Sequence, residues 1–268
     1  MLGAGIHSDA RIHPSAVVED GATIGAGAEI GPFSVIGPDV TLHDGVIVKS
    51  HAVVTGWTEI GAGSVIFPFA SVGEVPQDLK YRGERTRLIV GQRNRIREGA
   101  TLNTGTEGGG GVTRVGDDCL FMSGAHVGHD AQVGSRVVVA NQSAIAGHCV
   151  IEDDVIIGGL SGIHQWVRVG RGAIIGAVTM VTNDVIPHGL VQGPRGTLDG
   201  LNLVGLKRRG IAREEIAALR AAYGKLSSGE GAFQERAKAL QSSESALVRE
   251  IAAFILASSD RSFLAPRT

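Results

Sequence analysis

Residues 24–48 read IGAGAEIGPFSVIGPDVTLHDGVIV, and in this stretch a large apolar residue returns at every sixth position. The same period runs through residues 6–72, resumes over 90–102 and continues over 115–181. An amphipathic helix needs apolar spacings of three and four, and a strand in a simple hairpin alternates by two, so neither element explains a period of six. The period instead indicates a stack of short, equivalent units.

A six-residue unit cannot bury its one large side chain alone, so successive units must stack around a shared core. Three units complete one triangular coil, and residues eighteen apart then lie above each other at about 4.8 Å, the spacing of neighbouring strands. We therefore predict a mainly β protein, a left-handed parallel β-helix (hexapeptide-repeat solenoid) over residues 1–194, with the handedness taken from proteins that share this repeat. The forty glycines fit a fold of tight turns.

Two segments interrupt the repeat and should leave the prism as loops, at residues 73–89 and 105–114. The first keeps the period in phase, whereas the second inserts residues and resets the period before Val115. Loops held by a rigid scaffold often carry binding residues. The first loop contains a polar set of side chains: Gln77, Asp78, Lys80 and Tyr81.

After residue 194 the composition changes, and we predict a C-terminal α-helical domain over residues 195–268. A short helix is expected around the KRRG segment, followed by helices near 213–226, 232–240 and 243–256. Ser243 is the expected N-cap of the last helix, because a serine side chain can accept a hydrogen bond from the first helical turn. Such a domain would also cover one open end of the solenoid, which otherwise presents an unpaired edge.

The charge balance excludes some classes of partner. The formal net charge is −2, so no bulk electrostatic field draws the chain to nucleic acid or to anionic lipid. No apolar stretch reaches membrane-spanning length, so we expect no stable membrane insertion and a cytoplasmic location. The two cysteines, Cys119 and Cys149, occupy equivalent places in their repeats, and we expect both to be small buried thiols.

Clustered histidines are the main chemical clue. Four of the nine lie close together in the sequence: His126, His129, His148 and His164. Histidine suits proton transfer because its unperturbed pKa is about 6.5. Asp130 follows His129, and a carboxylate beside an imidazole can fix its tautomer. Neighbours on a strand point to opposite sides, so Asp130 needs a corner of the chain to turn toward His129.

The eighteen-residue register places His129 in one column with Gly147 and Gln165, so the clustered histidines should share one region of one wall. Two other interpretations stay open from the residues alone. The HxxH spacing of His126 and His129 permits a zinc site, since three histidines can hold zinc with an open fourth position. The histidines could also decorate a purely structural scaffold.

Several motifs make the chain similar to a known family. GEVPQDLKY (73–81), RNRIRE (93–98), AHVGHD (125–130), AGH (146–148), IHQ (163–165) and GLKRRG (205–210) occur in the order and spacing of the UDP-N-acetylglucosamine O-acyltransferase family. The resemblance covers essentially the whole chain. It implies a homotrimer with active sites between subunits, which transfers a 3-hydroxyacyl group from acyl carrier protein to the sugar 3-hydroxyl at the start of lipid A biosynthesis. No metal or diffusible cofactor is implied beyond the carrier's phosphopantetheine arm.

The resemblance also assigns residues. It implies that His129 is the general base, that Asp130 orients it, and that the backbone N–H of Gly147 stabilises the oxyanion. Ala177 would limit the depth of the acyl groove. The residues implied to bind substrate are Gln77, Asp78, Lys80, His126, His148, His164, Gln165, Asn202, Arg208 and Arg209. Basic residues implied as candidates to dock the acidic carrier protein are Lys207, Arg213 and Arg220.

The chain departs from the family pattern at three positions. Asn103 and Thr104 stand where the family often has histidine and arginine, and this raises N-acyl transfer to a 3-amino analogue of the sugar as an alternative. Val204 stands where an acidic residue is common, which would remove one contact to ribose. Two further alternatives are another hexapeptide-repeat acyltransferase with a coenzyme A donor and, in a different class, a trimeric zinc hydro-lyase of the same architecture.

Overall fold

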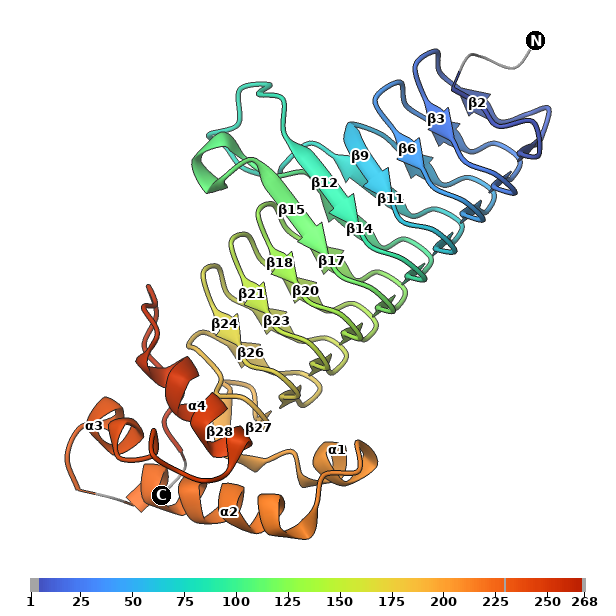
Figure 1. The fold of residues 1–268 in the computed structure, drawn as a ribbon. Coiled ribbons are helices and arrows are strands. Elements are labelled where there is room, and N and C mark those ends of the chain that lie inside the picture. The colour runs from blue at the N-terminus through green and yellow to red at the C-terminus, as the bar shows by residue number, and fades with distance from the viewer. Residues whose placement is uncertain (1–4, 229, 267–268) are drawn as a thin grey trace.

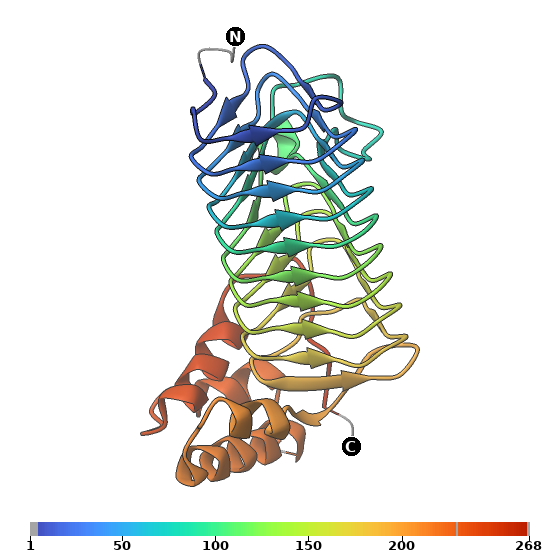
Figure 2. The same ribbon diagram turned by 90° about the vertical axis from the view of Figure 1, so that its right-hand side faces the viewer.

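The protein is a triangular prism of short parallel strands with a group of helices at its C-terminal end (Figure 1). The computed structural model describes residues 5–228 and 230–266. Seen from the side, the strands of each coil lie directly over those of the next coil (Figure 2). The parallel β-helix predicted from the period of six is confirmed, with three sheets that each gain one strand per coil.

Three sheets form the faces of the prism. The first face comprises β1 (Arg11–Ile12), β4 (Glu29–Ile30), β7 (Ile47–Val48), β10 (Val65–Ile66), β13 (Arg95–Ile96), β16 (Leu120–Phe121), β19 (Val138–Val139), β22 (Ile156–Ile157), β25 (Ile174–Ile175), β27 (Gly189–Gln192) and β28 (Thr197–Leu201). The second face comprises β2 (Val17–Val18), β5 (Val35–Ile36), β8 (Val53–Val54), β11 (Ser71–Glu74), β14 (Thr101–Asn103), β17 (His126–Val127), β20 (Ala144–Ile145), β23 (Gly162–Ile163) and β26 (Met180–Val181). The third face comprises β3 (Thr23–Ile24), β6 (Thr41–Leu42), β9 (Trp57–Ile60), β12 (Arg87–Val90), β15 (Val112–Val115), β18 (Gln132–Val133), β21 (Val150–Ile151) and β24 (Arg168–Val169).

Strand register confirms the expected phase of both interruptions. In regular coils the paired residues are eighteen apart, as in Ile30 with Val48. Across the first loop Ile66 pairs with Ile96, thirty residues on, so twelve residues leave the prism and the period of six survives. Across the second loop Ile96 pairs with Phe121, twenty-five residues on, so seven residues leave and the phase is reset.

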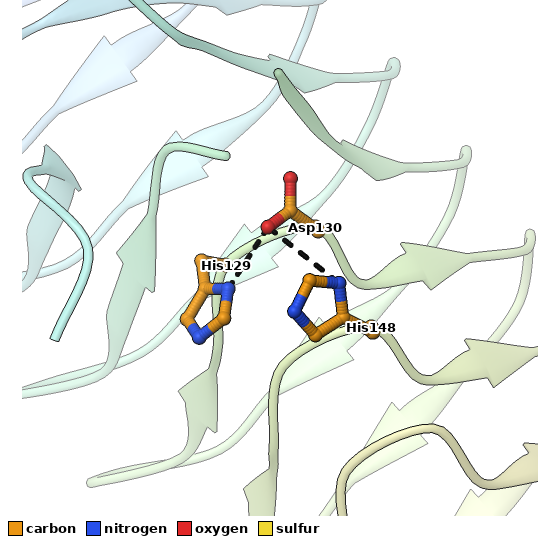
Figure 3. Close-up of side chains that lie close together, drawn as sticks. All are labelled: His129, Asp130 and His148. Carbon is orange, nitrogen blue, oxygen red and sulfur yellow. Dashed lines mark hydrogen bonds and ion pairs between the residues drawn. The ribbon is translucent and has the colours of Figure 1, made fainter. Parts of the chain in front are cut away.

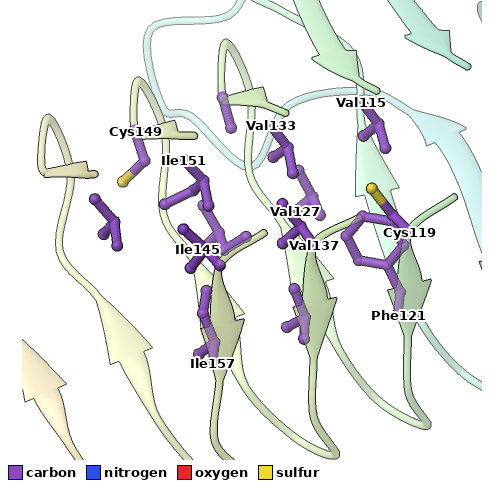
Figure 4. Packing of buried hydrophobic residues seen from close by; sticks show 14 of the residues in the cluster. Val115, Cys119, Phe121, Val127, Val133, Val137, Ile145, Cys149, Ile151 and Ile157 are labelled. Atoms are coloured by element: carbon purple, nitrogen blue, oxygen red, sulfur yellow. The ribbon is translucent and has the colours of Figure 1, made fainter. Parts of the chain in front are cut away.

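The inward positions of the repeat form one continuous core (Figure 4). Phe121 is the largest fully buried side chain and lies among aliphatic residues such as Val127 and Val139. Cys119 and Cys149 are free and buried, as predicted. Burial raises the pKa of the Cys119 thiol to about 11 and that of Cys149 to about 12, so both stay protonated at neutral pH.

The turns between faces form three columns, one along each edge of the prism. Fourteen described residues other than glycine have positive φ, and many of them occupy these turns. The histidine corner joins the second face to the third and contains Asp130, His148 and Trp166. The arginine corner joins the third face to the first and contains Arg93, Asp118, Arg136 and Asp154. The apolar corner joins the first face to the second and contains Phe33, His51, Phe69, Leu160 and Val178.

Backbone hydrogen bonds between coils hold these turns, for example from the N–H of His148 to the carbonyl of His129 at 3.0 Å. Sixteen described glycines also have positive φ, which confirms that glycine serves many of the tight turns, where positive φ costs it least. The ladder of contacts from coil to coil lets bulky residues adopt this conformation as well. The corners can therefore carry functional side chains.

In the described part of the chain, four helices follow the solenoid: α1 (Leu203–Arg208), α2 (Arg213–Ser228), α3 (Phe233–Lys238) and α4 (Ala246–Leu256). All four predicted helices are present. Ser243 is not the N-cap of α4, and that prediction is wrong. The cap is Ser245, whose hydroxyl accepts the N–H of Val248 at 3.2 Å, while Ser243 accepts the N–H of Ser245. None of these helices is both long and apolar enough to cross a membrane.

An antiparallel hairpin joins the solenoid to the helices. β27 and β28 pair antiparallel at the end of the first face, so strand structure continues past residue 194 to Leu201. The Tyr223 hydroxyl on α2 donates to the carbonyl of Leu198 at 3.0 Å, which fixes the helices to this last strand. The helices thus cover the C-terminal edge of the solenoid, as the sequence suggested.

A buried ion pair anchors the C-terminal tail to the prism. Asp184 is fully buried and accepts hydrogen bonds from the guanidinium of Arg168 at 2.7 Å and from the hydroxyl of Ser259 at 2.6 Å. Its backbone N–H donates to the carbonyl of Ser262, and its carbonyl accepts the N–H of Leu264. One residue therefore fixes the last coil, the tail and a buried arginine together.

We expect Asp184→Asn to lower the free energy of unfolding by about 3 kcal/mol, because removing one partner leaves the Arg168 charge buried and uncompensated. Equilibrium unfolding in urea measures this difference. The matched control is Asp118→Asn, which breaks an exposed pair with Arg93 of similar geometry and should change stability little. Equal losses in the two variants would contradict the role assigned to Asp184.

Candidate active site

His129 and Asp130 lie in the turn between β17 and β18, on the histidine corner (Figure 3). Asp130 has φ of 60°, and this left-handed turn brings its carboxylate beside the preceding histidine. The distance from His129 Nδ1 to Asp130 Oδ2 is 2.9 Å. The side chains are only 7% and 1% exposed. The corner geometry that the sequence permitted is therefore present.

The hydrogen bond fixes the tautomer of His129. An ionised carboxylate can only accept, so the proton lies on Nδ1 and Nε2 keeps its lone pair. The imidazole rests directly on Gly147 of the next coil, where a Cβ would lie 2.6 Å from Nε2. The predicted column of His129 and Gly147 is confirmed, and a glycine is required there because any side chain would displace the ring.

Gly147 also offers an unused hydrogen-bond donor. The residue is buried, and within the described part of the chain its backbone N–H donates to no acceptor. A backbone N–H that the fold leaves unpaired beside a histidine is available to a ligand oxygen.

His148 and Trp166 extend the histidine corner by two coils. The ring of His148 lies edge-on to that of His129, with 4.8 Å between ring centroids, and its Nδ1 is 3.7 Å from Asp130 Oδ2. Trp166 stacks flat on His148 at 3.9 Å between centroids and an angle of 6°. Sequence reasoning missed Trp166, although the eighteen-residue register places it below Asp130 and His148.

The second loop contributes Thr106, which sequence reasoning also missed. Its backbone N–H donates to Asp130 Oδ1 at 2.8 Å and its hydroxyl donates to Oδ2 at 2.6 Å. Because this loop lies outside the repeat, no register could have placed Thr106 beside the carboxylate.

His126 lies on β17 of the second face and its Nδ1 is 2.7 Å from the hydroxyl of Thr101. Burial lowers the pKa of His126, and the nearby His129 lowers it further. Burial also lowers the pKa of His148, although the carboxylate of Asp130 opposes this effect. Both rings are therefore neutral at pH 7.

A cavity of about 210 Å³ opens between the two loops and the histidine corner. It brings together three residues predicted to bind substrate: Asp78, Lys80 and His148. The other lining residues are Tyr81, Glu84, Thr106, Glu107, Gly108 and Trp166. Gln77 is exposed and does not line the cavity.

His164 and Gln165 meet the C-terminal tail instead of this cavity. The guanidinium of Arg261 lies 2.8 Å from His164 Nδ1 and donates from Nε to the carbonyl of Gln165 at 3.1 Å. The C-terminal tail therefore contacts the histidine corner one coil beyond His148. Arg261 is a further residue at this wall that the sequence did not indicate.

Asn202, Arg208 and Arg209 line a different pocket of about 250 Å³, which lies over the first face and the arginine corner. This pocket shares no lining residue with the cavity beside His148. Three arginines line it, Arg136, Arg208 and Arg209, with one acidic residue, Asp154, which already pairs with Arg136 at 2.7 Å. Positive charge is therefore in excess among the lining residues, so the pocket suits an anion. Val204 is exposed at its rim.

The side chain of Asn202 is engaged in holding α1. Its Oδ1 accepts the N–H of Gly205 at 2.8 Å as the helix N-cap, and its Nδ2 donates to the carbonyl of Gly172 at 3.0 Å. Only 5% of the residue is exposed. Asn202 therefore shapes the pocket, whereas the charged groups are supplied by the arginines.

Two of the three departures from the family pattern, Asn103 and Thr104, anchor the first loop. Asn103 is buried and its Nδ2 donates to the carbonyls of Glu74 and Val75 at 3.2 and 3.0 Å. The hydroxyl of Thr104 lies 3.2 Å from that of Thr86 at the other end of the same loop. Neither residue lines the cavity beside His148. The departures therefore affect how the loop is held and do not face the cavity.

One group among the described residues could hold a metal ion: His129, Asp130 and His148, with ligand atoms within 4.8 Å of one another. Both oxygens of Asp130 already accept hydrogen bonds from Thr106. The group also holds two histidines, one fewer than the predicted zinc alternative requires. The donors fit a histidine–carboxylate pair better than a zinc site.

Comparisons with known proteins agree with the motifs. Residues 184–264 match the family described as UDP N-acetylglucosamine O-acyltransferase, domain 2, and residues 3–38, 22–56 and 113–147 match bacterial transferase hexapeptide repeats. An acyl-(acyl-carrier-protein)–UDP-N-acetylglucosamine O-acyltransferase of Paracoccus denitrificans is 69% identical over 199 residues, which cover 74% of this chain and 76% of that protein. The chain belongs to the UDP-N-acetylglucosamine O-acyltransferase family.

Other members agree over a larger share of the chain. The relative of the same name from Agrobacterium fabrum is 45% identical over 232 residues, which cover 85% of this chain and 86% of that protein. The solved structure of UDP-N-acetylglucosamine acyltransferase from Campylobacter jejuni is 36% identical, with a TM-score of 0.91 over 96% of this chain and all of that chain. The Francisella novicida structure of this family is 34% identical, with a TM-score of 0.87 over 98% of this chain and 95% of that chain.

Titration of two half-buried histidines, His126 and His148, tests the electrostatics of the site. We expect the imidazole resonances of His126 and His148 to titrate below pH 6.5, the midpoint of a free side chain. The unfolded chain then binds protons more readily, so stability is highest above about pH 6.5 and declines as the pH falls below it. His126→Gln should flatten this decline, whereas His13→Gln on an exposed turn should not. A midpoint at or above 6.5 would reject the assignment.

Proposed function

We propose that this chain transfers a 3-hydroxyacyl group from acyl carrier protein to the 3-hydroxyl of UDP-N-acetylglucosamine in lipid A biosynthesis, with His129 as general base. The observation that carries this proposal is the buried His129–Asp130 pair, whose ring lies directly on Gly147, the residue with the unpaired N–H. Relatives at 69% and 45% identity carry the name of this activity.

The proposed reaction is a direct transfer. Nε2 of His129 removes the proton from the sugar hydroxyl as that oxygen attacks the thioester carbonyl. Asp130 stabilises the imidazolium through Nδ1. The N–H of Gly147 donates to the carbonyl oxygen as it becomes an oxyanion, a contribution of about 3 kcal/mol in comparable sites. The C–S bond then breaks, and the leaving thiolate takes the proton back from His129.

Exposed groups support an acylated donor on a carrier protein. Leu160, Val178 and Met180 leave a strip of apolar surface beside Ala177, which suits an acyl chain. Lys207, Arg213 and Arg220 are exposed on α1 and α2, where they can attract an acidic carrier. The reaction needs no metal or diffusible cofactor besides the phosphopantetheine arm that the carrier brings.

A homotrimer completes the proposed site. The sugar cavity lies at the histidine corner, whereas the arginine pocket suited to the diphosphate lies over the first face of the same prism. One nucleotide sugar can occupy both if the first face of one subunit meets the histidine corner of the next. We place this assembly in the cytoplasm, where Cys119 and Cys149 stay reduced.

We expect His129→Ala to reduce kcat about 1000-fold, because general-base catalysis by one side chain contributes up to this order. Turnover is measured with purified protein, UDP-N-acetylglucosamine and 3-hydroxyacyl carrier protein, and nucleotide-sugar affinity is measured by calorimetry. Affinity should change by less than about threefold, since Lys80 and His148 still line the cavity. The matched control His13→Ala, on an exposed turn, should keep full turnover.

The alternatives predict different results in the same assay. Turnover with acetyl-coenzyme A but not with the carrier protein, or with only the 3-amino sugar analogue as acceptor, would replace the proposed substrates. One zinc ion per site in protein prepared without chelator would favour the hydro-lyase. Wild-type turnover in the His129→Ala variant would remove the proposed base.

Acyl-chain length tests the role of Ala177. We expect Ala177→Gly to shift preference toward longer 3-hydroxyacyl chains, because removing the methyl group deepens the groove beside the apolar strip. Relative kcat/KM across a series of acyl lengths measures the shift, and one methylene in a hydrophobic pocket is worth about 10- to 200-fold in specificity. An unchanged order of preference in the variant would exclude Ala177 from the groove.

A further inference from the structure

The second loop closes over the carboxylate of Asp130. Thr106 is 8% exposed and Asp130 is 3% exposed. Two glycines of the loop pack directly against the carboxylate: a Cβ at Gly105 would lie 2.7 Å from Oδ1, and one at Gly109 would overlap the group. These positions must be glycine for the loop to reach Asp130, which explains part of the glycine-rich sequence.

The loop is held in the conformation that presents Thr106. The carbonyl of Thr106 accepts the N–H groups of Gly109 and Gly111 at 3.0 and 2.8 Å, while its own N–H and hydroxyl both point to Asp130. On the other side, the N–H of Asp130 donates to the hydroxyl of Thr113 on β15 at 2.7 Å. The second loop and β15 therefore both hold Asp130 by hydrogen bonds.

These hydrogen bonds decide which histidine the Asp130 carboxylate contacts. Oδ2 lies 2.9 Å from Nδ1 of His129 and 3.7 Å from Nδ1 of His148. Because the two distances are close, a modest rotation of the carboxylate would change its partner. The Thr106 hydroxyl binds Oδ2 and its N–H binds Oδ1, and two donors on two oxygens fix the plane of the carboxylate. A carboxylate held in this way keeps the proton of His129 on Nδ1.

We propose that Thr106 is a positioning residue for catalysis: it holds Asp130 toward His129 and thereby keeps Nε2 of His129 available as the base. The inference deepens the proposed acyl transfer and rests on it. Thr106, Glu107 and Gly108 also line the substrate cavity, so the same loop forms one wall of the cavity and orients the base.

The test compares Thr106→Val, which keeps the shape and removes the donor, with Thr106→Ser, which keeps the donor. We expect Thr106→Val to lower kcat at least tenfold with KM for UDP-N-acetylglucosamine within twofold, and Thr106→Ser to stay within threefold of wild type. The matched control is Thr58→Val, a buried threonine on β9 that lines neither the substrate cavity nor the arginine pocket. It should stay within threefold of wild type.

Nitrogen NMR of the imidazoles gives a readout that does not need turnover. In wild type His129 should be the Nδ1–H tautomer, and in Thr106→Val the Nε2–H tautomer should gain population while Thr106→Ser stays like wild type. Thr106→Val with unchanged kcat and tautomer, or equal losses in the Val and Ser variants, would overturn the positioning role. A wild-type protein inactive with both substrates would instead defeat the proposed function, and the tautomer would still decide the role of Thr106.

Discussion

Vertical stacking at the spacing of a parallel β-ladder is the constraint on which this molecule depends. Each coil hydrogen-bonds to the coils above and below, so in every coil without an inserted loop the neighbours of a residue are set eighteen positions away. Each coil buries its large aliphatic side chains in a core that it shares with the coils above and below. The same ladder holds corner residues at positive φ, and it places Asp130, His148 and Trp166 in one column.

The three corners of the prism have become chemically different. The histidine corner holds the buried pair with the free Nε2, the arginine corner ends near a pocket with three guanidinium groups, and the apolar corner exposes Phe33, Phe69, Leu160 and Val178. A nucleotide sugar with an acyl donor has a polar reacting centre, an anionic end and an apolar tail. In one chain these corners point apart, so an assembly of several prisms is the simplest way to bring them together.

Most of the fold follows from the sequence because the period directly reports the three-dimensional neighbours. Register alone placed His129 over Gly147, and it could also have placed Trp166 under His148. It could not place Thr106, because the seven-residue insertion has no partner in the repeat. The same limit applies to local capping: Ser243 and Ser245 are equally suited by residue type, and only the packed helix selects Ser245. From the sequence Asn202 likewise looks like a residue that binds substrate, whereas in the structure its side-chain oxygen caps α1.

The contact of the His129 ring with Gly147 limits how such a chain can lengthen during evolution. Solenoids lengthen readily when a coil is duplicated, because each new coil finds the same surface above and below it. A copy of the coil that carries His129 would set one imidazole on the Cα of another histidine, where the ring needs the empty space of a glycine. The coil that carries the His129–Asp130 pair therefore cannot be duplicated directly beside itself without displacing the ring, so a longer solenoid has to gain its coils elsewhere along the prism.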